Sequence, residues 1–247
     1  MISANGEHSA MSHEQRQPFL AWPGWRHLFL TLRLSAALGA WWIVVYCGAN
    51  SITQLHSYRV RLHFDAELNI PFVPAAVFAY MSIYPLLWSS PFILRQRRDL
   101  IAFAVTLATV TGVAGLCFLL FPADSFFPEP PANYAWQGLV RFAKTLALRH
   151  NLAPSLHVAL SAVGVIVYAR RASLAVAALL WVWSVIVAAS TMLLHQHYLI
   201  DVVTGYLLAW IMVRLVYERG VDWSGDQAIP LTSSAPPKYQ ESSHSPS

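Results

Sequence analysis

Six apolar stretches, each close to the length of a bilayer crossing, run through this chain of 247 residues. A helix needs roughly 20 mostly apolar residues to cross the hydrocarbon core of a membrane. Hydrophobic residues make up 56% of the chain and charged residues 11%, a balance unlike that of soluble domains. We therefore predict an all-α fold, a six-span transmembrane helical bundle, with helices near Leu28–Cys47, Pro71–Leu94, Leu100–Phe121, Pro154–Tyr168, Leu174–Leu194 and Tyr198–Tyr217.

Two of these spans have features that a straight helix of full length lacks. The second carries prolines at 71, 74, 85 and 91, which should bend or cap its helix while neighbouring helices satisfy the freed carbonyls. The fourth is short, but Arg170 and Arg171 at its end can reach the membrane interface with their long side chains.

The spans divide the chain into a tail of residues 1–27, a membrane domain of residues 28–217 and a second tail of residues 218–247. Met1–Gln17 and residues 222–247 are rich in Ser, Pro, Gln and His and show no apolar period, so we predict disordered termini. The N-terminal tail lacks the short apolar core and cleavage site of a signal peptide, and the first span is expected to remain as an anchor.

Arginine-rich loops predict how this multi-pass protein sits in its membrane, because Lys and Arg concentrate in short cytoplasmic loops. The densest clusters are Arg95–Asp99 and Ala169–Ser173. With six alternating spans, both loops and both termini are cytoplasmic, and the other side receives Gly48–Ile70, Pro122–Ala153 and His195–His197. The formal net charge of +4 follows mostly from this arginine bias, so we expect no nucleic-acid partner.

Three ionisable residues stand at the non-cytoplasmic ends of the fourth and sixth spans: His157, His197 and Asp201. An aspartate at membrane depth is costly and normally faces the bundle interior with a partner. His197 lies four residues before Asp201, on the same face of a helix, and is the expected partner. Because both spans begin on the same side, all three side chains are predicted to meet at one depth.

A basic cluster precedes these residues, formed by Arg141, Lys144 and Arg149. Basic residues on the non-cytoplasmic side run against the orientation rule and require a reason. A guanidinium group can bind phosphate through two hydrogen bonds. Lys144 and Arg149, together with Ser155, are the candidate phosphate-binding residues, whereas Arg141 is at least as well explained by contact with lipid headgroups.

Pro-Ser-Leu-His, followed by Ser-Thr, five residues, His, three residues and Asp, resembles the second and third motifs of the type 2 phosphatidic acid phosphatase superfamily. "NLAPSLHVA", "HQHYLIDVVTG" and "DAELNIPFVPAAVFAYMSIY" are most similar to the branch that includes inositol phosphorylceramide synthases. The resemblance implies phosphoryl transfer in which His197 attacks phosphorus, Asp201 orients His197, and His157 protonates the leaving oxygen. It implies no metal and no other cofactor.

The sequence departs from the phosphatase motifs at three positions. Leu156 replaces the usual Gly of the second motif, Thr191 replaces the Arg of the third, and Asn151 stands where the first motif has its Arg. These changes leave open which residues bind the phosphate, and by resemblance they favour the transferase branch.

The expected substrate is a lipid phosphate, processed at the non-cytoplasmic face of the membrane, and several functions remain open. Attack by water on a phosphohistidine would make a phosphatase, and attack by a lipid or polyol alcohol would make a phosphotransferase. A zinc site could use His157, His195, His197 and Asp201, although the basic cluster would repel a cation. A proton-coupled transporter could use His197 and Asp201 as a relay.

Overall fold

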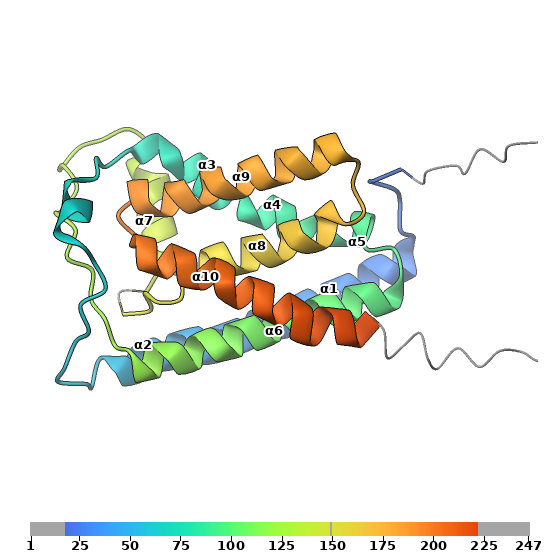
Figure 1. Ribbon diagram of the computed structural model, residues 1–247, viewed down its shortest axis with the longest axis horizontal. Coiled ribbons are helices and arrows are strands. Elements are labelled where there is room, and N and C mark those ends of the chain that lie inside the picture. Colours follow the sequence, from blue (N-terminus) through green and yellow to red (C-terminus); the bar gives the residue numbers. More distant parts are fainter. Residues whose placement is uncertain (1–17, 149, 222–247) are drawn as a thin grey trace, which may run out of the picture.

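The computed structural model describes residues 18–148 and 150–221 (Figure 1). Met1–Gln17 and residues 222–247, for which we predict disorder, lie outside the described residues. Within the described ranges the chain is helical without a strand, apart from a single β-bridge between Val60 and Ala123. The α-helices are α1 Trp25–Trp42, α2 Gly48–Thr53, α3 Val77–Met81, α4 Ile83–Trp88, α5 Ser90–Ile93, α6 Arg97–Leu120, α7 Gln137–Leu146, α8 Leu156–Ala169, α9 Leu174–Leu193 and α10 Leu199–Met212.

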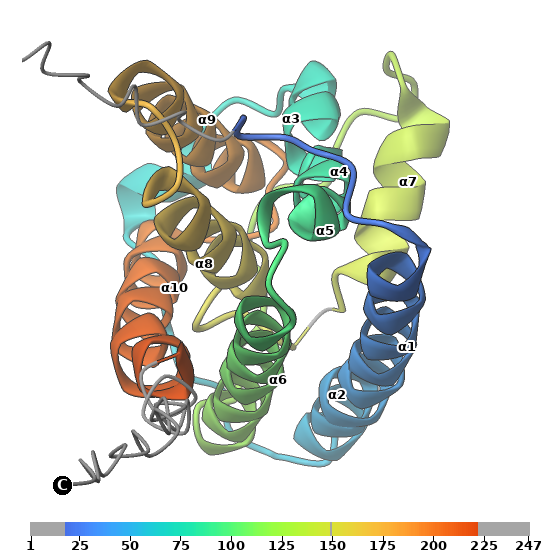
Figure 2. The ribbon, with the colours of Figure 1, turned by 90° about the vertical axis from the view of Figure 1, so that its right-hand side faces the viewer.

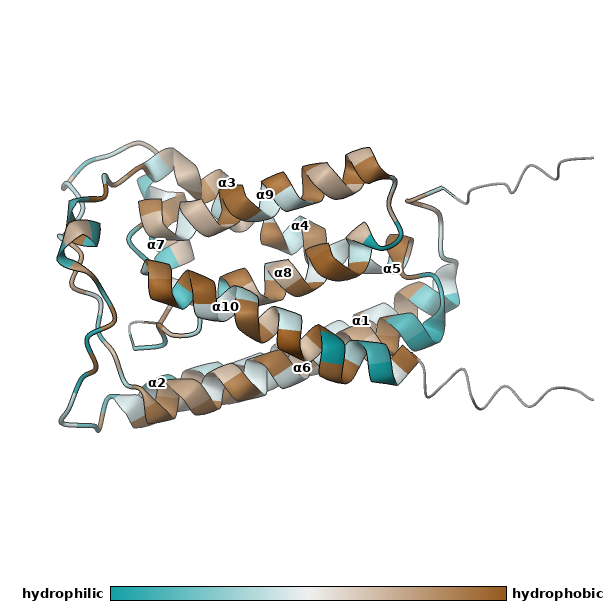
Figure 3. Cartoon of the chain, in the orientation of Figure 1, coloured by the Kyte–Doolittle hydropathy of each residue, from teal (hydrophilic) through white to brown (hydrophobic). Residues whose placement is uncertain are grey.

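Four helical segments are long and apolar enough to cross a membrane, and they fit an integral membrane protein: Trp25–Thr53, Arg97–Leu120, Leu174–Leu193 and Leu199–Val221. They correspond to the first, third, fifth and sixth predicted spans. The first joins α1 to α2 through a π-helical turn at Ile43–Cys47, so it continues past its predicted end. Figure 3 shows the apolar residues spread along these helices.

The second and fourth predicted spans are shorter apolar helices, Pro74–Trp88 and Leu156–Ala169. In the second, the chain breaks into short pieces: a 3₁₀ turn, α3, α4 and α5. Pro74 and Pro91 lie in the first turn of their pieces, where a missing N–H costs nothing. Length and composition therefore support four crossings, and six crossings stay a prediction.

Helix α8 lies at the centre of the bundle, in contact with α4, α6, α9 and α10 (Figure 2). Its 14 residues span about 21 Å, less than the roughly 30 Å of a hydrocarbon core. The preceding residues Asn151, Leu152 and Ser155 are also buried. Irregular backbone is tolerated at membrane depth where protein surrounds it, so α8 can begin inside the bundle, with His157 in its first turn.

The two arginine-rich loops meet at one end of the bundle, which we call the arginine end. Arg171 forms an ion pair of 2.9 Å with the buried Asp99 at the start of α6. Arg170 forms one of 2.5 Å with Glu218, in the π-helical turn that follows α10. These pairs tie the α8–α9 loop to α6 and to the end of the α10 segment.

The opposite end, the loop end, carries the long connections and one helix that the sequence analysis missed (Figure 1). The prediction of a loop throughout Pro122–Ala153 is wrong for Gln137–Leu146, which forms α7. Val140 and Ala143 are buried, and α7 contacts α3, while Arg141 and Phe142 are exposed. This helix is amphipathic and too short to cross a membrane, and for that reason a search for apolar stretches passes over it.

Candidate active site

The turn between α9 and α10 brings His197 to the loop end of the bundle. The backbone N–H groups of Gln196 and His197 donate to the carbonyl of Thr191, at 2.9 and 3.3 Å. His195 adopts a left-handed conformation with φ of 58°, which reverses the chain direction. His197 therefore sits just ahead of α10, opposite the first turn of that helix.

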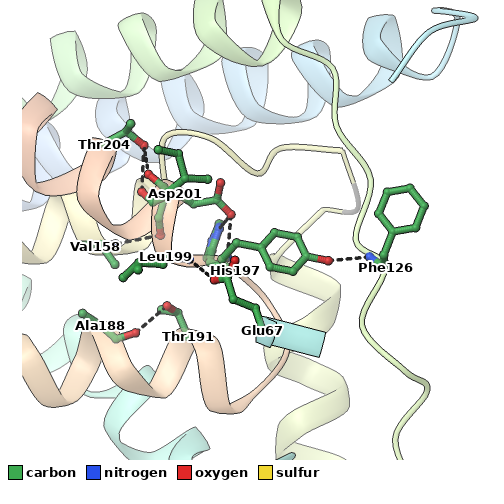
Figure 4. Close-up of polar contacts among 12 residues, drawn as sticks. Glu67, Phe126, Val158, Ala188, Thr191, His197, Leu199, Asp201 and Thr204 are labelled. Carbon is green, nitrogen blue, oxygen red and sulfur yellow. Dashed lines mark hydrogen bonds and ion pairs between the residues drawn. The ribbon is translucent and has the colours of Figure 1, made fainter. Parts of the chain in front are cut away.

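His197 and Asp201 face each other across this first turn (Figure 4). Nδ1 of His197 lies 3.5 Å from Oδ2 of Asp201, which is longer than a good hydrogen bond. The same Oδ2 accepts the backbone N–H of Tyr198 at 2.8 Å. Asp201 is fully buried, and its carboxylate both caps α10 and stands beside the imidazole.

His157 is held by α3, on the other side of the site. Its Nε2 lies 2.7 Å from the carbonyl oxygen of Tyr80, and its ring stacks on the Tyr80 ring with centroids 3.8 Å apart. A carbonyl oxygen only accepts hydrogen bonds, so Nε2 of His157 carries a hydrogen. The remaining ring nitrogen, Nδ1, is therefore the one that can exchange a proton with a substrate.

Both imidazoles line one cavity of about 390 Å³. The rest of its lining is mostly apolar and comes mainly from α1, α4, α6 and α8, with further residues from α3, α5 and the end of α7. Along α1 and the π-helical turn that follows it, the lining extends from Thr31 to Tyr46, which corresponds to about 22 Å of helix. The two histidines thus stand at one end of an elongated, largely apolar chamber inside the bundle.

The predicted phosphate-binding residues have different positions. Arg149 lies outside the described residues. Lys144 is half-buried on α7, with Nζ 5.5 Å from the centre of the Phe72 ring, and burial lowers its pKa. Ser155 is buried and its Oγ accepts the N–H of Val158, capping α8. Within the described part of the chain neither residue lines the cavity, and a phosphate contact by either stays a prediction.

His195 belongs to the scaffold of the turn. Its Nε2 lies 2.9 Å from the carbonyl oxygen of Ile70, and its ring stacks on Phe127 with centroids 4.4 Å apart. Among residues 18–148 and 150–221, no group of three or more His, Cys, Asp or Glu side chains is arranged to hold a metal ion.

Two residues next to the site were not singled out from the sequence. Tyr80 supports His157, and Glu67 accepts the N–H of Leu199 at the start of α10, at 2.6 Å. Both lie in the phrase "DAELNIPFVPAAVFAYMSIY", whose likeness to the synthase branch was the only available signal. No spacing rule connects them to residues so far along the chain.

A known family model matches a segment of this chain that includes His157, His197 and Asp201. Residues 117–223 match the family model of the PAP2 superfamily. This match contains α8, α9 and α10 in full, together with His157, His197 and Asp201. Neither the curated proteins nor the solved structures that were compared gave a match to the chain.

Proposed function

We propose that this protein is an integral membrane enzyme that transfers the phosphoryl group of a lipid phosphate through a phosphohistidine at His197. The observation that carries the proposal is that His157 and His197 line one largely apolar cavity, with the carboxylate of Asp201 against the second imidazole. The match to the PAP2 superfamily, whose members are generally phosphatases or phosphotransferases, supports the reaction class.

In the first half of the reaction, Nδ1–H of His197 faces the carboxylate of Asp201, which leaves the lone pair on Nε2. Nε2 attacks phosphorus, and the bond from phosphorus to the leaving oxygen breaks. Nδ1 of His157 donates a proton to that oxygen, while its Nε2–H stays on the carbonyl of Tyr80. As His197 becomes cationic, the buried carboxylate stabilises the charge.

In the second half, the neutral His157 acts as a base. It takes a proton from the incoming hydroxyl group, whose oxygen attacks phosphorus and releases Nε2 of His197. Water as the acceptor gives inorganic phosphate, and an alcohol gives a new phosphate ester. The same three residues serve both outcomes, so the acceptor distinguishes a phosphatase from a phosphotransferase of the inositol phosphorylceramide synthase type.

The shape of the cavity favours an amphiphilic substrate. An apolar chain can occupy the chamber along α1 and α6 while the phosphate stays beside the histidines at the loop end. Lys144 and Arg149 are the proposed phosphate ligands. A dianion beside Lys144 would favour its charged form and so offset the effect of burial on its pKa.

The test is to follow the label of a ³²P-labelled lipid phosphate incubated with the purified protein, with and without glycerol or inositol as acceptor. We expect label in inorganic phosphate or in the acceptor, and a transient label on the protein. His197→Ala should abolish all three, because it removes the attacking atom. His56→Ala, a histidine substitution elsewhere at the loop end, is the control. Transfer that survives His197→Ala would refute the phosphohistidine.

A further inference from the structure

Glu67 is a buried carboxylate in the loop that precedes α3, in a 3₁₀ turn at Asp65–Asn69. This turn lies against the start of α10, on the same side as His197 (Figure 4). Only 7% of the residue's surface is exposed, so its charge depends on protein partners for stabilisation.

Both carboxylate oxygens of Glu67 accept backbone N–H groups. Oε2 accepts the N–H of Phe64 at 2.8 Å, which closes its own turn. Oε1 accepts the N–H of Leu199, the first residue of α10, at 2.6 Å. The first N–H groups of a helix have no partner within it, and a carboxylate bound there is favoured by charge and by the helix dipole.

Two carboxylates therefore share the beginning of α10. Asp201 binds the N–H of Tyr198 from within the helix, and Glu67 binds the next N–H, that of Leu199, from the loop. They are two of the three residues that connect His197 to Asp201, the third being Ile200. The backbone that sets the distance between imidazole and carboxylate is consequently held at its first two N–H groups.

The same loop also forms hydrogen bonds with the chain ahead of His197. The carbonyl of Ile70 binds Nε2 of His195, and the N–H of Val73 donates to the carbonyl of Leu193 at 2.9 Å. His197 lies between these contacts and the Glu67–Leu199 bond. Among the described residues, Glu67 is the only acidic side chain of this loop that binds the chain around His197. Each of its two carboxylate oxygens accepts a backbone N–H.

We infer that Glu67 is a positioning residue for the nucleophile: it acts through the Leu199 N–H to keep His197 aligned with Asp201 and with the cavity. The inference rests on the proposed function, because it concerns the rate at which His197 forms a phosphohistidine. Glu67 itself touches no reacting atom.

The experiment measures single-turnover labelling of His197 by ³²P-labelled lipid phosphate in Glu67→Gln, with Asp65→Asn as control. The glutamine side chain keeps the shape of glutamate but has one acceptor oxygen instead of two. Asp65 lies in the same turn and is exposed, with its side chain paired to Arg61. We expect the maximal rate constant of labelling to fall about 100-fold in Glu67→Gln, while the concentration that gives half of the maximal rate constant and the labelled fraction stay close to wild type. Asp65→Asn should show no such fall.

Leu199→Pro tests the same bond from its other partner. Proline is favoured at the first position of a helix and removes the N–H, and Tyr198 already has the extended backbone that precedes proline, with φ −98° and ψ 167°. We expect Leu199→Pro to slow labelling as Glu67→Gln does. The double variant should be no slower than the worse single variant, because both remove one interaction.

The outcomes separate the two proposals. A wild-type protein that forms no phosphohistidine would overturn the proposed function, and this inference with it. An active wild type with an unchanged rate constant in Glu67→Gln would overturn the inference alone. So would a loss confined to the labelled fraction, or a double variant slowed by the product of the single effects, because these would indicate a purely structural role.

Discussion

Gly205 of α10 packs directly against the backbone of Ser155: a Cβ atom on Gly205 would lie 2.8 Å from the Ser155 carbonyl oxygen. One turn earlier, the N–H of Ser155 donates to the carbonyl of Asp201 at 2.9 Å. These contacts bring α8 and α10 together where both helices begin. The separation of His157 from His197 therefore depends in part on the close approach of the two helices at Gly205.

Gly205→Ala should push α10 away from α8 and impair both stability and turnover. The added methyl group meets backbone, which cannot rotate aside, and overpacking of this kind costs about 1–3 kcal/mol. Thermal unfolding in detergent and the rate of lipid phosphate turnover measure the two effects. Gly48→Ala in α2, where a Cβ has open space, should be neutral or stabilising by about 0.5–1 kcal/mol. Equal behaviour of the two variants would contradict the packing argument.

Gly39→Leu should shorten the chamber available to a lipid chain. Gly39 lines the cavity, and a Cβ on it meets no atom within 4 Å, so the larger side chain can extend into free space. We expect turnover of a long-chain lipid phosphate to fall about 10-fold or more, with little change for a short, soluble phosphate ester. Gly48→Leu is the matched control, because Gly48 is equally open but does not line the cavity. A uniform loss on both substrates would argue against a chain in the chamber.

His157→Ala should affect substrates according to their leaving groups. A general acid contributes about 10²–10⁴-fold when a basic alkoxide leaves, whereas a nitrophenyl oxyanion needs no proton. Turnover of an alkyl lipid phosphate should collapse, while release of nitrophenol survives. If His157 also activates the acceptor, phosphate should accumulate on His197. Equal losses on both substrates would mean that His157 binds phosphate or holds the fold.

Cysteine labelling should place the two ends of the bundle on opposite sides of the membrane. In a background with Cys47 and Cys117 replaced, Ala132→Cys should react from outside, and Ser173→Cys only after the membrane is opened. Both positions are exposed: Ala132 lies between α6 and α7, and Ser173 caps α9 at the arginine end. An impermeant maleimide reports each one. Labelling of both positions from one side would refute the predicted topology.

The long helices could be predicted from the sequence because lipid offers no partners for backbone N–H and C=O groups, and an apolar stretch of sufficient length must therefore be helical. Span five was predicted to end at Leu194, and α9 ends at Leu193. The prolines of the second span were expected to bend or cap its helix, and the structure divides this span into short helical pieces. Helix α7 is amphipathic and has only 10 residues, so no long apolar stretch marks it in the sequence.

The pairing of His197 with Asp201 was predicted from their spacing of four residues on a helix face. The two side chains do meet, but His197 lies ahead of α10, so the contact forms across the capping turn at the start of the helix. The sequence also indicated which residues would be costly in lipid and would need partners. Those inferences are local, since they depend on spacing along one segment and on the solvent around it.

The partners of the remaining groups were decided only by the tertiary structure. Tyr80 binds His157 from 77 residues away, and Glu67 binds Leu199 from 132 residues away. Contacts of this kind depend on how separate helices pack and on where the loops between them come to rest. The apolar chamber arises in the same way, because its walls come from four separate helices, α1, α4, α6 and α8. Chemical type and spacing determined the candidate residues, and packing between distant segments determined what surrounds them.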